Sequence, residues 1–201
     1  MGCGGEGKRR CTPSLAAVIQ DCRTRLLEMF VSPGGTGDHA KGATMAKSVF
    51  YSFHYERDVN RVQLVRNINA LEGQPLLNAQ AWEEVRESGD AAIEDWIGTQ
   101  MAYKKAVIVL IGQQTAGRKW VNYEINKAWA DKKPLLGVRI HGLSSMGTVD
   151  RAGASPFSAT SGIPVFDPTT LTWDGKIDSK ATYKKLVDNL EWWSSQGKVR
   201  S

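Results

Sequence analysis

The run from Ala106 to Ile111 has the sequence AVIVLI and is apolar at every position. A short apolar run of this kind is typical of a β-strand that is covered on both faces, because a strand with one face in water alternates apolar and polar residues. Helices are the usual cover for the two faces of a parallel sheet. The run therefore predicts an α/β protein with helices on both sides of a parallel sheet.

Strand-like and helix-like segments alternate along the rest of the chain. Segments of strand character are 47–53, 74–79 and 135–140, and segments with apolar residues at helical spacing are 58–71, 90–103, 119–131 and 180–194. This alternation predicts a three-layer, flavodoxin-like open sheet of four or five mostly parallel strands. Ligands of such sheets bind outside the carboxyl ends of the strands. The loops expected to border a site follow Phe53, Ala79, Ile111 and Ile140.

The composition of the chain changes at Met45. All three cysteines lie before this residue and all seven tryptophans lie after it. Residues 1–44 begin Gly-rich and end in a linker-like stretch, which predicts a disordered extension or a start-site artefact. Residues 45–201 are expected to form one domain, with an irregular excursion at 144–175, where 17 of 32 residues are Ser, Thr, Gly or Pro, and a terminal helix at 180–194.

The formal net charge of +5 comes from 26 Lys and Arg against 21 Asp and Glu. These basic residues occur as scattered pairs at expected helix ends, which suits a solvated surface, so nucleic acid is not expected as a partner. No stretch reaches the roughly 18 consecutive apolar residues of a membrane span, and the cysteine spacing matches no zinc pattern. We therefore expect a cytoplasmic protein with no membrane partner and no bound metal.

The loop after the AVIVLI run has the glycine spacing of a nucleotide-binding P-loop, with four residues between Gly112 and Gly117. A P-loop needs Lys and then Ser or Thr after its second glycine, to hold the phosphates and magnesium. Arg118 and Lys119 occupy these two positions, so the loop does not predict an NTPase. Arg118 and the start of the following helix are still candidates to contact an anion.

Two segments resemble parts of TIR domains. Residues 49–61 (VFYSFHYERDVNR) are similar to the first strand and following loop of those domains, and residues 111–125 (IGQQTAGRKWVNYEI) are similar to their third strand and helix start. In TIR domains a Trp near this helix start is followed four residues later by Glu, as Trp120 and Glu124 are here. The stretches SFHYERD, LIGQQT, RKWVNYEI and SPF are particularly similar to the TIR-like ThsB proteins of the bacterial Thoeris anti-phage system, over residues 45–157.

This resemblance implies an enzyme that cleaves the nicotinamide–ribose bond of NAD, with NAD as substrate and no bound cofactor. It also implies that the ADP-ribose is cyclised or transferred into a diffusible signal, which activates a partner effector of the ThsA type. TIR-like domains include scaffolds as well as NAD-consuming enzymes. The alternative is therefore a catalytically silent binding or assembly module, and whether the chain forms a homo-oligomer is open.

Glu124 is the candidate catalytic residue. Breaking an N-glycosidic bond builds positive charge on the ribose, and a carboxylate beside the ribose stabilises that charge and can help to deprotonate a hydroxyl for cyclisation. Trp120 precedes Glu124 by one helical turn, so its indole is expected to desolvate the carboxylate and wall the pocket. From the residues alone, the competing interpretation is a solvated Glu124 paired with Lys127. The resemblance favours the catalytic interpretation.

The first two substrate-binding candidates, Phe53 and His54, end the first strand and are expected to border the adenine or the nicotinamide. For His54, the alternative to a role in binding is an ordinary histidine of a surface loop. For Trp82, a further binding candidate, the alternative is packing under a lid. Asp58 is expected to cap the following helix, and Arg61 to pack or pair on it. The complete set of substrate-binding candidates is Phe53, His54, Trp82, Arg118 and Trp120.

Overall fold

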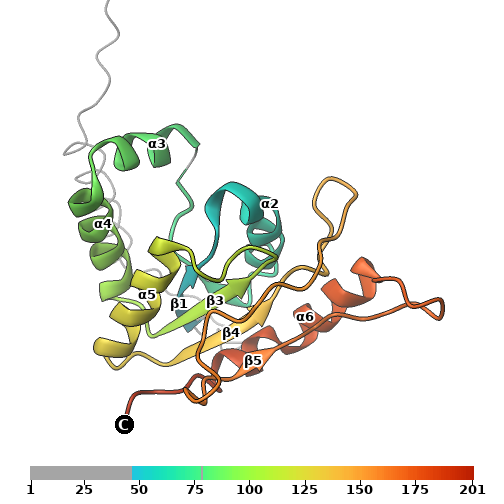
Figure 1. Cartoon of the computed structure of the whole chain (residues 1–201). Coiled ribbons are helices and arrows are strands. Elements are labelled where there is room, and N and C mark those ends of the chain that lie inside the picture. The colour runs from blue at the N-terminus through green and yellow to red at the C-terminus, as the bar shows by residue number, and fades with distance from the viewer. Residues whose placement is uncertain (1–46, 78) are drawn as a thin grey trace, which may run out of the picture. The chain divides into compact units, whose positions relative to one another are not determined.

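The computed structural model of the chain describes residues 47–77 and 79–201 (Figure 1). The predicted extension 1–44 and the boundary at Met45 lie outside these residues. None of the helices in the described part is long and apolar enough to cross a membrane.

The described residues form two compact units. The smaller unit contains residues 77 and 79–93, with helix α3 (Ala79–Glu87) and the first turn of α4 (Asp90–Ala102). The larger unit contains residues 47–76 and 94–201, and with them the whole sheet. All the candidate site residues except Trp82 belong to the larger unit.

The sheet of the larger unit has five strands, all parallel, in the order β2-β1-β3-β4-β5 (Figure 1). The strands are β1 (Lys47–Ser52), β2 (Leu71–Glu72), β3 (Ala106–Ile111), β4 (Leu135–Arg139) and β5 (Val165–Phe166). Every residue of the AVIVLI strand β3 is fully buried, which confirms a strand covered on both faces. The expected open sheet of parallel strands is also confirmed.

Helices cover the sheet on its two faces. Helices α2 (Tyr55–Arg66) and α6 (Ser179–Ser194) contribute to the main apolar cluster together with one face of the sheet. Helix α5 (Lys119–Ala130) packs against β1, β3 and β4. Successive side chains of a strand point to opposite faces, so Tyr51 of β1 lies in the α2 and α6 layer while Ser52 points to the other layer.

The strand predicted at 74–79 is wrong, because β2 is only two residues long and ends at Glu72. The side chain of Gln74 takes the place of further strand pairing. Its amide oxygen accepts from the Tyr51 N–H at 2.8 Å, and its amide nitrogen donates to the Tyr51 carbonyl at 2.7 Å. Pro75 follows and has no N–H to continue a ladder. Both backbone groups of Tyr51 are thus satisfied without a longer β2.

Other boundaries differ from the sequence-based expectations where the chain turns. Helix α2 begins at Tyr55 and ends at Arg66, not at 58–71, because the chain turns back at Asn69, which has a positive φ of 56°, and enters β2. Helix α3 was not expected, and β5 lies inside the stretch 144–175 that was expected to be irregular. Helices α4, α5 and α6 agree with their predicted ranges to within one residue at each end.

Candidate active site

Glu124 lies on the buried side of α5, and its exposed fraction is 8%. Ser52, the last residue of β1, is fully buried and donates a hydrogen bond from its Oγ to Oε2 of Glu124 at 2.5 Å. The competing interpretation of a solvated Glu124 paired with Lys127 is wrong, since Lys127 forms an ion pair with Asp131 at 3.1 Å. The structure thus places the Glu124 carboxyl group at the carboxyl end of β1, where the parallel sheet was expected to border a site.

Burial raises the pKa of the Glu124 carboxyl group to about 8, and the Ser52 hydrogen bond acts in the opposite direction. No charged group in the described part of the chain contributes to this shift. The carboxyl group is therefore mostly protonated at neutral pH, and it ionises at a pH only slightly higher. A titratable group poised in this range is typical of a functional site.

The loop after β3 is held tightly against α2. The Gly112 N–H donates to Oγ1 of Thr115 at 2.8 Å, and a Cβ added to Gly112 would lie 2.3 Å from Oδ2 of Asp58. The buried carboxyl group of Asp58 therefore packs directly on the Gly112 backbone, and no larger residue fits there. This contact fixes the start of the loop that leads to Arg118 and α5.

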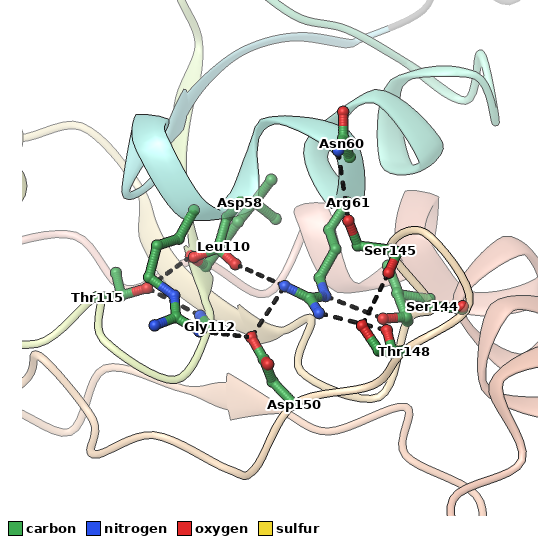
Figure 2. A network of polar contacts seen from close by, with 12 residues as sticks. Asp58, Asn60, Arg61, Leu110, Gly112, Thr115, Ser144, Ser145, Thr148 and Asp150 are labelled. Carbon is green, nitrogen blue, oxygen red and sulfur yellow. Dashed lines mark hydrogen bonds and ion pairs between the residues drawn. The ribbon is translucent and has the colours of Figure 1, made fainter.

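Arg61 joins α2 to the segment after β4, as Figure 2 shows. Its Nη1 lies 3.2 Å from Oδ1 of Asp58 and 2.9 Å from Oδ2 of Asp150, and its Nε donates to the Leu143 carbonyl at 2.9 Å. The prediction that Asp58 caps α2 is wrong. The N-cap residue is His54, and Asp58 lies a full turn into the helix, where its side chain points inward to Arg61. The predicted pairing of Arg61 on this helix is confirmed.

The excursion after β4 passes directly over the loop that follows β3. A Cβ on Gly153 would lie 2.2 Å from the carbonyl oxygen of Gly112, so the two backbones are in contact. Arg139 of β4 donates a hydrogen bond from Nη1 to the Gly153 carbonyl at 2.7 Å and so links the excursion to the sheet. The neighbouring Ala154 lines an open depression of about 480 Å³ together with Gln113, Gln114, Ala116, Gly117 and Arg118.

His54 and Arg118 are brought close enough to influence each other. The His54 side chain is 11% exposed, and its Nε2 lies 3.7 Å from a carboxylate oxygen of Glu56. Its Nδ1 is buried and has no hydrogen-bond partner among the described residues. Burial and then the Arg118 charge lower the pKa of His54, so the ring is neutral at physiological pH. Arg118 is exposed and bonds to the backbone and side-chain oxygens of Gln114 at 3.1 and 2.9 Å.

The three aromatic candidates, Trp120, Phe53 and Trp82, have different neighbours in the structure. Trp120 is half-buried, with its ring centroid 5.9 Å from that of Tyr123 and 4.6 Å from the Lys119 ammonium group. Phe53 is partly buried and packs against the main apolar cluster. Trp82 lies half-buried on α3, in the smaller unit, so its predicted role at the site stays a prediction.

Two features of the site were not anticipated from the sequence. Ser52 stands in the SFHYERD segment but received no role, because nothing in the pattern indicates which side chain will meet its hydroxyl group. Asp150 gave no signal at all, since it lies 89 positions beyond Arg61 in a stretch without a regular pattern. In the described ranges, no group of three or more His, Cys, Asp or Glu side chains is arranged to hold a metal ion.

Comparison with known proteins gives this site a family context. Residues 50–145 match the family described as Thoeris protein ThsB, TIR-like domain. Over 119 residues the chain is 34% identical to a protein of Bacillus cereus (strain MSX-D12) named "Putative cyclic ADP-D-ribose synthase ThsB1". The match covers 56% of this chain and 62% of that protein, so the chain spans less than two thirds of the relative's length.

The parallel sheet, its helices on two faces and the family match together define a TIR-like α/β domain. Residues 50–145 are thus similar in sequence to TIR-like domains of the Thoeris ThsB type. The resemblance seen in the sequence segments around Ser52 and Glu124 is thereby confirmed.

Proposed function

We propose that this protein cleaves the nicotinamide–ribose bond of NAD and converts the ADP-ribose into a cyclic product that activates a ThsA-type effector in anti-phage defence. The observation that carries the proposal is the buried Glu124 carboxyl group held by Ser52 at the carboxyl end of β1. The similarity to a protein named as a cyclic ADP-D-ribose synthase supports it.

In the proposed reaction, the bond between ribose C1′ and the nicotinamide nitrogen breaks. Its electron pair leaves with the nitrogen, so the cationic ring departs as neutral nicotinamide and positive charge builds on the ribose. The Glu124 carboxylate stabilises this charge from a water-poor position, where a charge is worth more than in bulk water. A nucleophilic atom of the same ADP-ribose then closes the ring at C1′, and its proton passes to the carboxylate.

Arg118 is proposed to face the pyrophosphate of the dinucleotide. It borders the open depression over the loop after β3 and is held in place by Gln114. The N-terminal end of α5 begins beside it and adds a partial positive charge. Trp120, one turn before Glu124, is proposed to wall the nicotinamide end of the site.

Nicotinamide release from NAD tests this function. The full chain, Glu124→Gln and the matched control Glu191→Gln, at an exposed position of α6, are incubated with NAD in the presence and absence of lysate from phage-infected cells. We expect release by the wild type in at least one condition, loss of about 10²–10⁴-fold in Glu124→Gln, and no change in the control. Mass spectrometry of the product distinguishes cyclic from hydrolysed ADP-ribose.

Release by Glu124→Gln at the wild-type rate would contradict the catalytic assignment. Absence of release under both conditions would instead favour a catalytically silent binding or assembly module. The signalling step is tested separately, by adding the filtered product to a ThsA-type effector and measuring its activation.

A further inference from the structure

Among the residues that the structure describes, no positive charge compensates the buried Glu124 carboxyl group. Its exposed fraction is 8%, and its hydrogen-bond partner is the neutral hydroxyl of Ser52. An ionised carboxylate in such a place is costly unless a cation approaches it, so the ligand-free site favours the neutral acid. No side chain in the described part of the chain supplies that cation, so a cationic ligand is the group that would stabilise the carboxylate.

Of the two redox forms of the proposed substrate, only one carries a cation at the right end. The oxidised nicotinamide ring of NAD is positively charged, whereas the dihydronicotinamide ring of NADH is neutral. The adenosine and pyrophosphate parts of the two molecules are identical. A site that responds to ring charge therefore separates the two forms, even though nearly all of their surface is the same.

We infer that the Ser52–Glu124 pair is a charge-selecting element, which takes up an oxidised, cationic nicotinamide ring in exchange for one proton and gives the neutral reduced ring no such gain. The inference rests on the proposed function, because it concerns the same site and the same dinucleotide. In it, Glu124 contacts the ring or the adjoining ribose. Ser52 is a positioning residue, since its hydroxyl fixes one oxygen of the carboxyl group and favours the ionised form.

Other titratable groups near α5 do not supply this behaviour. Helix α5 packs against β1, β3 and β4, and Gly98 of α4 lies beside Lys127, but β3 has no titratable residue. None of the titratable side chains of these elements contributes to the pKa shift of Glu124. They are Lys47 and Tyr51 on β1, Arg139 on β4, Asp90, Glu94 and Asp95 on α4, and Lys119, Tyr123 and Lys127 on α5 itself.

His54 and Arg118 also lie at this edge of the sheet. Each is expected to face either a part of the dinucleotide that NAD and NADH share, or the side of the nicotinamide ring away from the Ser52–Glu124 pair. Burial and the Arg118 charge lower the pKa of His54 below its ordinary value, so this ring is mostly neutral over the pH range of the test and does not itself separate the two molecules. A difference between the two pH profiles isolates the effect of ring charge.

The test is equilibrium binding of two probes to the full chain. One probe is carba-NAD, a carbocyclic analogue that keeps the cationic ring but has no cleavable glycosidic bond, and the other is NADH. Because the cationic ring is expected to bind the ionised form of Glu124, the affinity for carba-NAD should rise roughly 25-fold between about pH 6.5 and about pH 8.5. The affinity for NADH should not rise. Calorimetry in buffers of different ionisation enthalpy should count close to one proton released per carba-NAD at the lower pH.

Two variants separate the roles. Glu124→Gln keeps the shape of the side chain without the titration, so its carba-NAD profile should be flat and its preference over NADH lost. Ser52→Ala should move the carba-NAD profile to higher pH, because the hydroxyl no longer favours the carboxylate. The exposed Glu191→Gln should reproduce the wild-type profile.

A wild-type carba-NAD affinity that does not change with pH, or that changes in parallel with the NADH affinity, would overturn the charge selection. If nicotinamide release still depended on Glu124 in that case, the proposed function would stand without it. Binding of neither probe, at any pH tested, would overturn both proposals.

Discussion

Ser52 and Glu124 are 72 positions apart in the chain, and their side chains meet in a buried hydrogen bond of 2.5 Å between Oγ and Oε2. The hydroxyl group comes from the end of a central strand and the carboxyl group from the helix after the next strand in the sheet. This bond joins β1 and α5 at the candidate site. The same bond has consequences for stability that need no substrate to be measured.

The first prediction concerns the pH dependence of stability in Glu124→Gln. The pKa of Glu124 is raised from 4.5 in the unfolded chain to about 8, so the folded protein keeps a proton that the unfolded chain loses. The stabilising contribution is complete below pH 4.5 and is lost as the pH rises to 8, with a total of about 5 kcal/mol. The glutamine variant lacks this loss and should gain stability relative to the wild type over that range.

Urea unfolding of both proteins at about pH 5 and about pH 8 measures this difference directly. Glu191→Gln serves as the control, and its stability should follow that of the wild type. If the wild type and Glu124→Gln lost stability in parallel, Glu124 would not be the buried acid that the structure describes.

A second prediction compares two arginines that approach Asp150. Arg61 is buried, whereas the Arg57 side chain is 39% exposed and lies 3.6 Å from the same carboxylate. Arg61→Ala leaves Asp58 and Asp150 without their buried partner and should lower the free energy of unfolding by about 3–5 kcal/mol. Arg57→Ala should cost at most about 1 kcal/mol, because its ion pair is in contact with solvent. Equal losses in urea unfolding would contradict the central place of Arg61.

A third prediction concerns the contact between the excursion and the loop after β3. In Gly153→Ala the new methyl group would overlap the Gly112 carbonyl oxygen, so the two segments must move apart, at a cost of about 1–3 kcal/mol. Gly98→Ala is the matched change in α4, where the nearest atom to the new methyl group is 3.7 Å away. It should raise stability by about 0.5–1 kcal/mol, because alanine favours the helix. The same sign for both variants would argue against the close backbone contact.

A fourth prediction tests Gln74 as the substitute for a longer β2. Gln74→Leu leaves the N–H and carbonyl groups of Tyr51 buried without partners and should destabilise the protein by about 2–5 kcal/mol. Gln63→Leu changes an exposed glutamine on α2 and should alter stability by no more than about 0.5 kcal/mol. Hydrogen exchange at the Tyr51 amide should be faster in Gln74→Leu and unchanged in Gln63→Leu.

The elements predicted correctly are those with a strong local pattern. The all-apolar run of β3 and the helical spacing in α4, α5 and α6 are properties of neighbouring residues, so they are visible without the rest of the chain. The failures lie where a distant partner decides. Gln74 has a strand-like position but bonds through its side chain, and β5 is only two residues long, formed because β4 offers it an edge.

The candidate site shows the same division. The sequence identified Glu124 through the spacing from Trp120 and the resemblance to TIR-like proteins, but it left open whether the carboxyl group was solvated or buried. The fold decided this, because α5 turns Glu124 toward Ser52 and away from water. For Asp58 the sequence favoured a helix cap, and the fold instead gave it Arg61 and the Gly112 backbone as neighbours.

What the sequence alone determined was the alternation of strands and helices, the parallel sheet and the residue types available at its carboxyl edge, because hydrophobic periodicity acts over a few residues at a time. What only the tertiary structure decided was the ionisation of Glu124 and the Arg61 links to Asp58 and Asp150. Both depend on burial among segments that are distant in sequence, and the free energy of a charge is set by the groups and the water around it rather than by its neighbours in the chain.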